Sequence, residues 1–190
     1  LSCFGDGRLY MEKGLVNPRH IEVQLLADEY GNIVHLGARN CSLQRRHQKL
    51  VEVAPGLVGA EVERKVIDSA LKIARHCGYR NAGTAEFLVD SDGNHYFLEI
   101  NTRLQVEHTV TEAITGIDIV RRQIRVAMGK PLDIAQKDVL CRGFAIEMRI
   151  NAEDPQNNFA PESGKTVNVY LSPGGPGIRL DGFVYQGLSL

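Results

Sequence analysis

The residues whose types and spacing most clearly suggest a chemical role are two glutamates. A predicted β-hairpin places them opposite each other. Asp92-Gly93 is the favoured centre of a two-residue type I′ turn, so the flanking segments 84–89 and 94–100 are predicted to pair as strands. This register puts Glu86 directly opposite Glu99. Opposed like charges destabilise a sheet unless a cation lies between them, and carboxylate oxygens suit Mg²⁺ or Mn²⁺. The alternative is a pair of solvated glutamates on an exposed face of the sheet.

Polar side chains continue at every second position beyond this hairpin, at Glu99, Asn101, Arg103, Gln105 and Glu107. In an extended chain these groups project to one side. Asn101 adds an oxygen ligand, Arg103 offers a planar fork for a small oxyanion, and Glu107 is placed to take a proton. These are the groups that phosphoryl transfer to a small oxyanion needs. An amphipathic edge strand would explain the alternation but not this choice of residues.

Further strands and helices must hold these groups in place, and their patterns predict an α+β fold. Strands are predicted at 20–28, 32–36, 50–54, 143–150 and 165–171, with a polar stretch at 41–49. Helices are predicted at 60–77, 109–115 and 117–128. Gly78 is expected to close the first helix and Asp118 to cap the last one. On the second face of the central hairpin, four apolar side chains are expected to be buried: Phe87, Val89, Tyr96 and Leu98.

Composition excludes several classes of protein. Hydrophobic residues make up 43% and charged residues 24% of the 190 positions, which is unlike a disordered chain, and no apolar run has the length of a membrane helix. The net charge of −1 gives no general case for nucleic acid. A nucleic-acid patch at Arg45–Lys49 therefore ranks below a nucleotide site. The chain begins with Leu1 rather than Met, so we expect a segment of a longer protein.

The four cysteines, Cys3, Cys41, Cys77 and Cys141, are too dispersed for a zinc ribbon or a dense disulfide framework. A reduced, intracellular setting is therefore expected. Cys41 adjoins the basic cluster, so it is either an accessible thiol with a lowered pKa or a packed cysteine.

Four longer stretches resemble biotin carboxylase, and they occur in the order that this family has. They are NPRHIEVQ at 17–24, CSLQRRHQK at 41–49, EINTRLQVEH at 99–108 and MRINAEDP at 148–155. The resemblance covers nearly the whole chain. It implies that residues 1–130 form the C-terminal part of an ATP-grasp domain and that 131–190 begin the biotin carboxylase C-terminal domain. Asn40 departs from the aspartate that many members of the family have before Cys-Ser.

The resemblance also implies roles for individual residues. The implied ATP site comprises Glu12, Lys13, Leu15, His20, Gln44 and His47. The implied metal site comprises Glu86, Glu99 and Asn101. The implied bicarbonate site comprises Lys49, Arg103, Gln105 and Val106. Glu107 is the implied base, acting with Arg103, Lys49 and Arg149, of which Arg149 steadies carboxyphosphate and the biotin enolate.

The implied activity is ATP-dependent carboxylation of biotin by bicarbonate through carboxyphosphate, a ligase reaction with Mg²⁺ or Mn²⁺. Implied partners are a biotin carboxyl carrier protein or domain, a carboxyltransferase component and a second copy of the intact enzyme. No nucleic acid or membrane partner is expected, and the setting is cytoplasmic, or the mitochondrial matrix in a eukaryote. The 190-residue piece is expected to be inactive alone, because the family's phosphate-covering loop would precede Leu1.

Two other interpretations remain open. Another ATP-grasp ligase, such as the carbamoyl-phosphate synthetase type, shares paired metal carboxylates and an Asn-x-Arg step. The tail Gln105–His108 and the cluster Arg45–Lys49 favour biotin carboxylase over it. A relic that binds nucleotide without catalysis is the third interpretation. The parent carboxylase and its acyl acceptor are not specified by these residues.

Overall fold

The computed structural model describes residues 5, 7–9, 11–171 and 174–190, so Tyr10 and Cys3 lie outside the described residues. The chain forms two compact units, Leu1–Met148 and Arg149–Leu190. The predicted domain boundary after residue 130 stays a prediction. In the described part of the chain no helix is long and apolar enough to span a membrane.

The described residues of the first unit form six strands, three α-helices and a short 3₁₀ helix. The strands are β1 (Arg19–Ala27), β2 (Ile33–Arg45), β3 (Gln48–Ala54), β4 (Asn81–Val89), β5 (His95–Asn101) and β6 (Ala145–Met148). The helices are α1 (Ala60–His76), α2 (His108–Thr115), α3 (Ile119–Ala127) and η1 (Gln136–Asp138).

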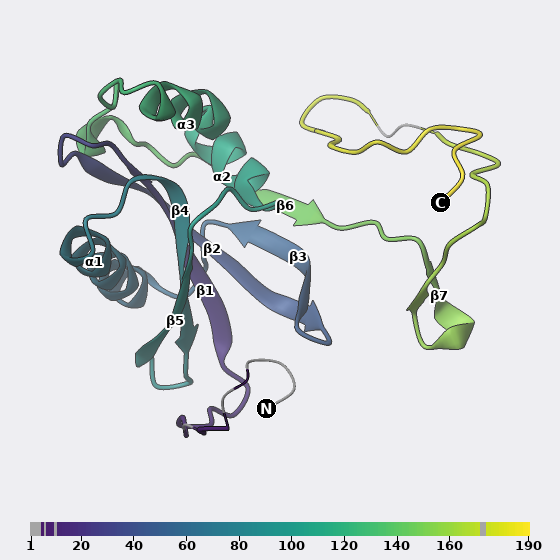
Figure 1. Ribbon diagram of the computed structural model, residues 1–190, viewed down its shortest axis with the longest axis horizontal. Helices are drawn as coiled ribbons and strands as arrows, with labels where there is room; N and C mark the ends of the chain where they lie inside the picture. The colour runs from purple at the N-terminus through teal and green to yellow at the C-terminus, as the bar shows by residue number, and fades with distance from the viewer. Residues whose placement is uncertain (1–4, 6, 10, 172–173) are drawn as a thin grey trace. The chain divides into compact units, whose positions relative to one another are not determined.

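The six strands form one antiparallel sheet in the order β5-β4-β1-β2-β3-β6 (Figure 1). β1 lies inside this sheet, and its last seven residues are all buried. The polar residues Glu22 and Gln24 of β1 are therefore interior groups, although a sequence that alternates in polarity usually has one solvated face. This sheet carries the polar site on one of its faces.

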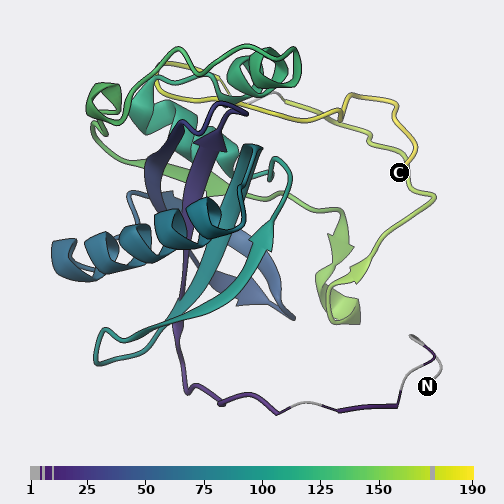
Figure 2. The same cartoon turned by 60° about the vertical axis from the view of Figure 1, so that its left-hand side comes forward.

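Helix α1 covers the opposite face of the sheet (Figure 2). Its buried residues Val66, Ala70 and Ala74 recur every four positions and pack against Ile21 and Phe87, among others. The helix ends as expected, because Gly78 adopts a left-handed conformation with φ 61°. This packing fixes the orientation of β1 and β4, so their alternate side chains must point to the other face.

Helices α2 and α3 lie on the same side as the polar groups. Asp118 caps α3 as predicted, since its carboxylate accepts a hydrogen bond of 2.7 Å from the backbone N–H of Arg121. Ile119 packs with Leu26 and Leu36 in a second apolar cluster. This cluster anchors α3 against the sheet, whereas α2 packs against Ala54 through Val110 and Ile114 in a third cluster.

The hairpin between β4 and β5 has the predicted opposition of Glu86 and Glu99, but its turn differs from the prediction. Val89 pairs with His95, and Asp90 N–H donates to Asn94 O, so the loop has one residue more than a two-residue turn. A register shift next to Glu86 compensates for the extra residue. The two irregularities cancel, which is why the expected glutamate pair still forms.

That register shift also changes the apolar face of the hairpin. Phe87 and Val89 are buried as predicted, and Phe87 makes an edge-to-face contact with Phe97 at 5.7 Å between ring centroids. Leu98 was expected to be buried and is instead 47% exposed. The bulge puts Phe97 opposite Phe87, so Leu98 has no partner on that face.

The stretch at 41–49 is a second hairpin rather than an irregular polar segment. β2 continues to Arg45 and pairs with β3, whose first residue Gln48 lies opposite Arg45. Arg46 and His47 form the two-residue turn with φ values of 51° and 63°. Such a turn needs positive φ at both positions and usually contains Asn or Gly, so the sequence offered no turn signal here.

The second unit has little regular structure. It contains the short strands β7 (Glu153–Asp154) and β8 (Ala160–Pro161) and the 3₁₀ helix η2 (Pro155–Asn157). The strand predicted at 165–171 is wrong: the segment has only an isolated bridge, between Thr166 and Ser189. A strand needs a neighbour along its length, and the pairing with 187–190 is too short to supply one.

Candidate functional site

Lys49 on β3 lies at the centre of a cluster of buried carboxylates. Its ammonium nitrogen is 2.5 Å from Glu22 Oε2, 2.9 Å from Glu86 Oε1 and 2.7 Å from Glu107 Oε1. An ammonium group has three N–H donors, so each of them has a carboxylate acceptor. Burial opposes the charge of Lys49, but the attraction of Glu22 and the three hydrogen bonds outweigh it and raise the pKa of Lys49.

Charged residues form a continuous row across four adjacent strands. Glu99, Glu86, Glu22 and Arg39 are successive cross-strand partners on β5, β4, β1 and β2. Side chains directly opposite each other on one face of a sheet have Cβ atoms about 5 Å apart, so these four residues are neighbours on that face. Strand pairing therefore brings four charged residues that are distant in sequence into one row on the sheet.

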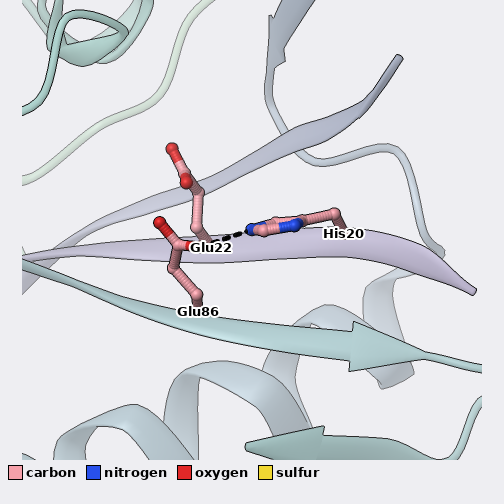
Figure 3. Close-up of side chains that lie close together, drawn as sticks. All are labelled: His20, Glu22 and Glu86. Carbon is pink, nitrogen blue, oxygen red and sulfur yellow. Dashed lines mark ion pairs between the residues drawn. The ribbon is translucent and has the colours of Figure 1, made fainter. Parts of the chain in front are cut away.

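Glu86 is a carboxylate of this row with partners on both of its oxygens. Its Oε1 accepts hydrogen bonds from Lys49, from Asn101 Nδ2 at 2.9 Å and from Gln105 Nε2 at 2.7 Å. Its Oε2 lies 2.7 Å from His20 Nε2, and His20, Glu22 and Glu86 are grouped together in Figure 3. Burial alone would raise the pKa of Glu86, but the contacts with His20 and with the Lys49 ammonium outweigh it and lower this pKa well below its usual range.

Glu107 occupies the position before the first residue of α2 and is 2% exposed. Burial disfavours its charge, whereas the Lys49 ammonium, its own backbone N–H and Arg39 favour it, and the net effect lowers the pKa of Glu107. The N-terminus of a helix also stabilises a carboxylate. Glu107 is therefore ionised at neutral pH and able to accept a proton.

Among the residues that the structure describes, two groups of His, Cys, Asp or Glu side chains have ligand atoms within 4.8 Å of one another: His20, Glu22 and Glu86, and Glu22, Cys41 and Glu107. In both groups the Lys49 ammonium already lies between the carboxylates. A metal ion there would have to displace that ammonium. The predicted set on β4 and β5 shares Glu86 with the first of these groups, so one of its members also contacts the ammonium.

The predicted set Glu86, Glu99 and Asn101 fits a hard divalent cation. The Asn101 side chain bridges the two carboxylates, with Nδ2 2.9 Å from Glu86 Oε1 and 3.1 Å from Glu99 Oε1. The two carboxylates and the Asn101 side-chain oxygen would hold a cation at this site. An all-oxygen set of this kind suits Mg²⁺ or Mn²⁺.

The predicted nucleotide residues are only partly brought together. Gln44 Nε2 is 3.1 Å from His20 Nδ1, and His20 in turn contacts Glu86. His20 therefore borders the carboxylate cluster directly, and Gln44 borders it through His20. His47 is exposed at the tip of the β2–β3 hairpin. Lys13 instead contacts β5, donating to the Tyr96 hydroxyl at 2.9 Å and lying 4.8 Å from the centre of its ring.

The remaining predicted residues lie at the edge of the cluster or outside it. Glu12 is exposed and Leu15 is half-buried, both before β1. Arg103 is exposed, with Nη1 donating to Leu104 O at 3.3 Å, and Val106 is 60% exposed. Arg149 belongs to the second unit, so its role stays a prediction.

Sequence reasoning missed several polar residues beneath Lys49. Glu22, Gln24, Arg39, Thr84 and Thr111 are all fully buried. Two of them had a detectable signal, because Glu22 and Gln24 are polar residues at alternate positions in an otherwise apolar strand. Arg39 had none, since the second strand was expected to end at Leu36.

Cys41 is a packed cysteine rather than an accessible thiol. It is 0% exposed, and burial together with the charge of Glu22 raises the pKa of its thiol. The nearby cations Lys49 and Arg39 favour the thiolate but do not outweigh these effects. Of the two interpretations of this residue, the structure supports the second.

Comparison with known proteins supports the resemblance. Residues 1–135 match the family described as carbamoyl-phosphate synthase L chain, ATP binding domain, and residues 147–190 match the biotin carboxylase C-terminal domain. The chain is 56% identical over 184 residues to pyruvate carboxylase 1 of Caenorhabditis elegans, covering 95% of this chain and 16% of that protein. It is 51% identical over 185 residues to the biotin carboxylase of a Nostoc species, covering 97% of this chain and 41% of that protein.

A solved structure gives the same result. The biotin carboxylase domain of Hydrogenobacter thermophilus 2-oxoglutarate carboxylase, solved as a dimer with MgADP, ADP and bicarbonate, matches with a TM-score of 0.93 and 51% identity. The match covers 100% of this chain and 42% of that one. The chain thus spans less than half the length of these relatives. The expected fold, part of an ATP-grasp domain followed by the start of a biotin carboxylase C-terminal domain, is confirmed.

Proposed function

The chain belongs to the biotin carboxylase family, and we propose that the complete protein carrying it carboxylates biotin with bicarbonate and ATP. The observation that carries this proposal is the Lys49 cluster. It combines an ionised candidate base, Glu107, with a buried ammonium and an adjacent oxygen site for a divalent cation. Phosphoryl transfer to a small oxyanion needs these three features in one place.

Bicarbonate is the proposed first acceptor of the phosphoryl group. The predicted bicarbonate residues lie around Glu107: Gln105 is two residues before it and shares the Glu86 carboxylate with Lys49, and Arg103 is exposed nearby with a planar fork. The related Hydrogenobacter domain was solved with bicarbonate and MgADP. We assign bicarbonate binding to Lys49, Arg103, Gln105 and the backbone at Val106.

The proposed nucleotide site lies along β1, β2 and the segment before β1. His20 contacts Glu86, and Gln44 contacts His20, so His20 links the nucleotide side of the cluster to the metal side. Glu12, Lys13, Leu15 and His47 complete the proposed ATP contacts. A divalent cation at Glu86, Glu99 and Asn101 would neutralise charge on the phosphates; Mg²⁺ is the proposed ion and Mn²⁺ a substitute.

The first proposed step is the attack of bicarbonate on ATP. Glu107 accepts the bicarbonate proton, a bicarbonate oxygen forms a bond to the γ-phosphorus, and the bond from that phosphorus to the ADP oxygen breaks. Carboxyphosphate and ADP result. Lys49 holds Glu107 in place, and Glu107 itself is buried, which limits the access of water to the proposed base.

The second proposed step transfers the carboxyl group to biotin. Carboxyphosphate releases CO₂ and phosphate, the phosphate takes the proton from the ureido nitrogen, and that nitrogen forms a bond to CO₂. Arg149 is proposed to steady carboxyphosphate and the biotin enolate. The match of residues 147–190 to the biotin carboxylase C-terminal domain supports biotin as the acceptor.

The remaining proposals concern the complete protein. We propose that a biotin carboxyl carrier protein or domain presents the biotin, that a carboxyltransferase component uses the product, and that the enzyme is a homodimer. The cytoplasm, or the mitochondrial matrix in a eukaryote, supplies the ATP, bicarbonate and reducing setting required. The family matches at 1–135 and 147–190 support an ATP-grasp part up to about residue 130 with the C-terminal domain following it.

An ATP-cleavage assay on the complete protein tests the function. We expect ADP release to require bicarbonate, to increase with free biotin and to yield labelled carboxybiotin from ¹⁴C-bicarbonate. Ammonia should not replace biotin. Formation of labelled carbamoyl phosphate from ammonia, without labelled biotin, would instead support the carbamoyl-phosphate synthetase type.

A further inference from the structure

Arg39 lies directly beneath the Lys49 cluster and is fully buried. Its Nε donates to Glu22 Oε1 at 2.5 Å. Its Nη1 donates to Gln24 Oε1 at 2.8 Å and Thr111 Oγ1 at 2.9 Å, and its Nη2 to Thr84 Oγ1 at 3.2 Å and Gln105 Oε1 at 3.4 Å. A guanidinium group has five N–H donors, so the number of acceptors equals the number of donors.

We propose that Arg39 is a positioning residue that fixes Gln105, Glu22 and α2 in the arrangement that bicarbonate activation requires. This inference rests on the proposed function. Arg39 does not itself reach the face on which substrate would bind, because all five of its contacts are to protein groups and it is 0% exposed.

Gln105 shows how Arg39 acts on a proposed bicarbonate contact. The Gln105 amide has Oε1 towards Arg39 and Nε2 towards Glu86 at 2.7 Å. If this amide were reversed, an N–H donor would face the guanidinium donors and a carbonyl oxygen would face the Glu86 carboxylate. Arg39 and Glu86 therefore allow one orientation, in which the N–H₂ group points into the cluster.

Glu22 transmits a second constraint. Its Oε1 is bound to Arg39 Nε and its Oε2 to Lys49 Nζ, each at 2.5 Å. The carboxylate thus bridges two cations, and the guanidinium of one of them is itself held by four further acceptors. Because Glu22 is one of the three acceptors of Lys49, the Arg39 fork sets where the ammonium lies.

Arg39 also holds helix α2 in position. Thr111, which accepts from Arg39 Nη1, lies four residues after Glu107 and so on the same side of this helix. The hydrogen bond holds the first turn of α2 against the sheet. It thereby fixes the proposed base relative to Lys49.

Replacing Arg39 by lysine tests this proposal, because lysine retains the charge but lacks the planar five-donor fork. In the complete protein, Arg39→Lys is expected to lower kcat/KM for bicarbonate by about 100-fold, mostly through KM, because several charge-assisted hydrogen bonds are lost. KM for MgATP should change by less than about twofold, since neither His20 nor Gln44 contacts Arg39. An equal fall in kcat/KM for bicarbonate and for MgATP, or an unchanged KM for bicarbonate, would overturn the proposal.

A stability control separates positioning from general loosening of the fold. Val66→Ala removes buried volume from α1 on the opposite face of the sheet and is expected to lower the melting temperature without changing either KM. If Arg39→Lys does not fold, Thr111→Val removes one acceptor with little change in shape. It should raise the bicarbonate KM by about fivefold, and no rise would contradict the inference.

A double substitution tests the proposed route through Gln105. Arg39→Lys is expected to raise the bicarbonate KM far less when Gln105 is already Ala, whereas equal effects in both backgrounds would exclude this route. The unsubstituted protein separates the two claims. Absence of bicarbonate-dependent ATP cleavage there would refute the proposed function and this inference with it, whereas normal activity with an unaffected Arg39→Lys variant would refute the inference alone.

Discussion

The ammonium of Lys49 lies 2.7 Å from the Glu107 carboxylate, and the two residues come from β3 and the start of α2. This contact lowers the pKa of the glutamate and raises that of the lysine. The glutamate is thus held ionised in a site with little access to water. A carboxylate in this state can receive a proton from an incoming oxyanion acid, which is the role proposed for Glu107.

Glu107→Gln removes the proposed base while preserving the size of the side chain. We expect bicarbonate-dependent ATP cleavage by the complete protein to fall by about 100-fold or more, because general-base catalysis contributes at least that much. Nucleotide affinity, measured by titration calorimetry, should change little. Glu61→Gln on the exposed side of α1 is the matched control, and full activity in the Glu107 variant would exclude the base assignment.

Glu99→Gln tests the metal site formed by β4 and β5. Glu99 is exposed and is linked to Glu86 through the Asn101 side chain, so the variant should fold normally. The affinity for MgATP should fall by about tenfold or more, while the affinity for ATP in EDTA should stay the same. Asp92→Asn, at the exposed tip of the same hairpin, is the control. An equal loss with and without Mg²⁺ would argue against a metal ligand.

Because the Asp28 carboxylate accepts several hydrogen bonds, we expect the folded protein to lose stability at low pH. It accepts hydrogen bonds from Tyr30 N, Asn32 N, Asn32 Nδ2 and Leu132 N, all between 2.8 and 2.9 Å. Burial opposes its charge, but these donors prevail and lower the pKa of Asp28. Its stabilisation is therefore complete above the unfolded pKa of about 3.9 and is lost as the pH falls through the folded value.

We expect Asp28→Asn to lower the free energy of unfolding by about 1–3 kcal/mol at pH 7, because the two donors at Oδ2, Asn32 Nδ2 and Leu132 N, would face an N–H₂ group in place of an acceptor. Urea unfolding at pH 7 and at pH 3 measures this. The difference in the free energy of unfolding between wild type and variant should be smaller at pH 3 than at pH 7. A difference that grows as the pH falls would contradict the sign of the shift.

The cysteines predict a selective pattern of alkylation. Cys77 is exposed, whereas Cys41 is fully buried with a raised pKa. Iodoacetamide at neutral pH should label Cys77 in the folded protein and Cys41 only after unfolding. Mass spectrometry of tryptic peptides measures the extent of labelling at each cysteine. Labelling of both residues at the same rate would show that Cys41 is accessible.

Local patterns in the sequence were sufficient to predict most of the strands and helices and the opposition of Glu86 and Glu99. The stripe of apolar residues along α1 and the cap at Asp118 are local signals, and both were confirmed. The β2–β3 hairpin was missed because its turn residues, Arg46 and His47, adopt positive φ without the usual Gly or Asn. Its formation depends on pairing within the whole sheet.

The polar groups beneath the site could not be predicted for a related reason. Arg39 meets Glu22 through the pairing of β1 and β2, and Thr111 through the docking of α2 against the sheet. Both are contacts between segments far apart in the chain. Alternation identified Glu107 as a candidate base, but only the assembled sheet reveals that Lys49 holds it.

The most direct test of the account is the fate of a bicarbonate oxygen during ATP cleavage. The complete protein would be supplied with MgATP, biotin and ¹⁸O-labelled bicarbonate, and the released phosphate analysed by mass spectrometry. Attack of bicarbonate on the γ-phosphorus predicts one ¹⁸O atom in each phosphate formed. Phosphate that carries oxygen from water alone would contradict the central claim that bicarbonate is the phosphoryl acceptor at the Lys49 cluster.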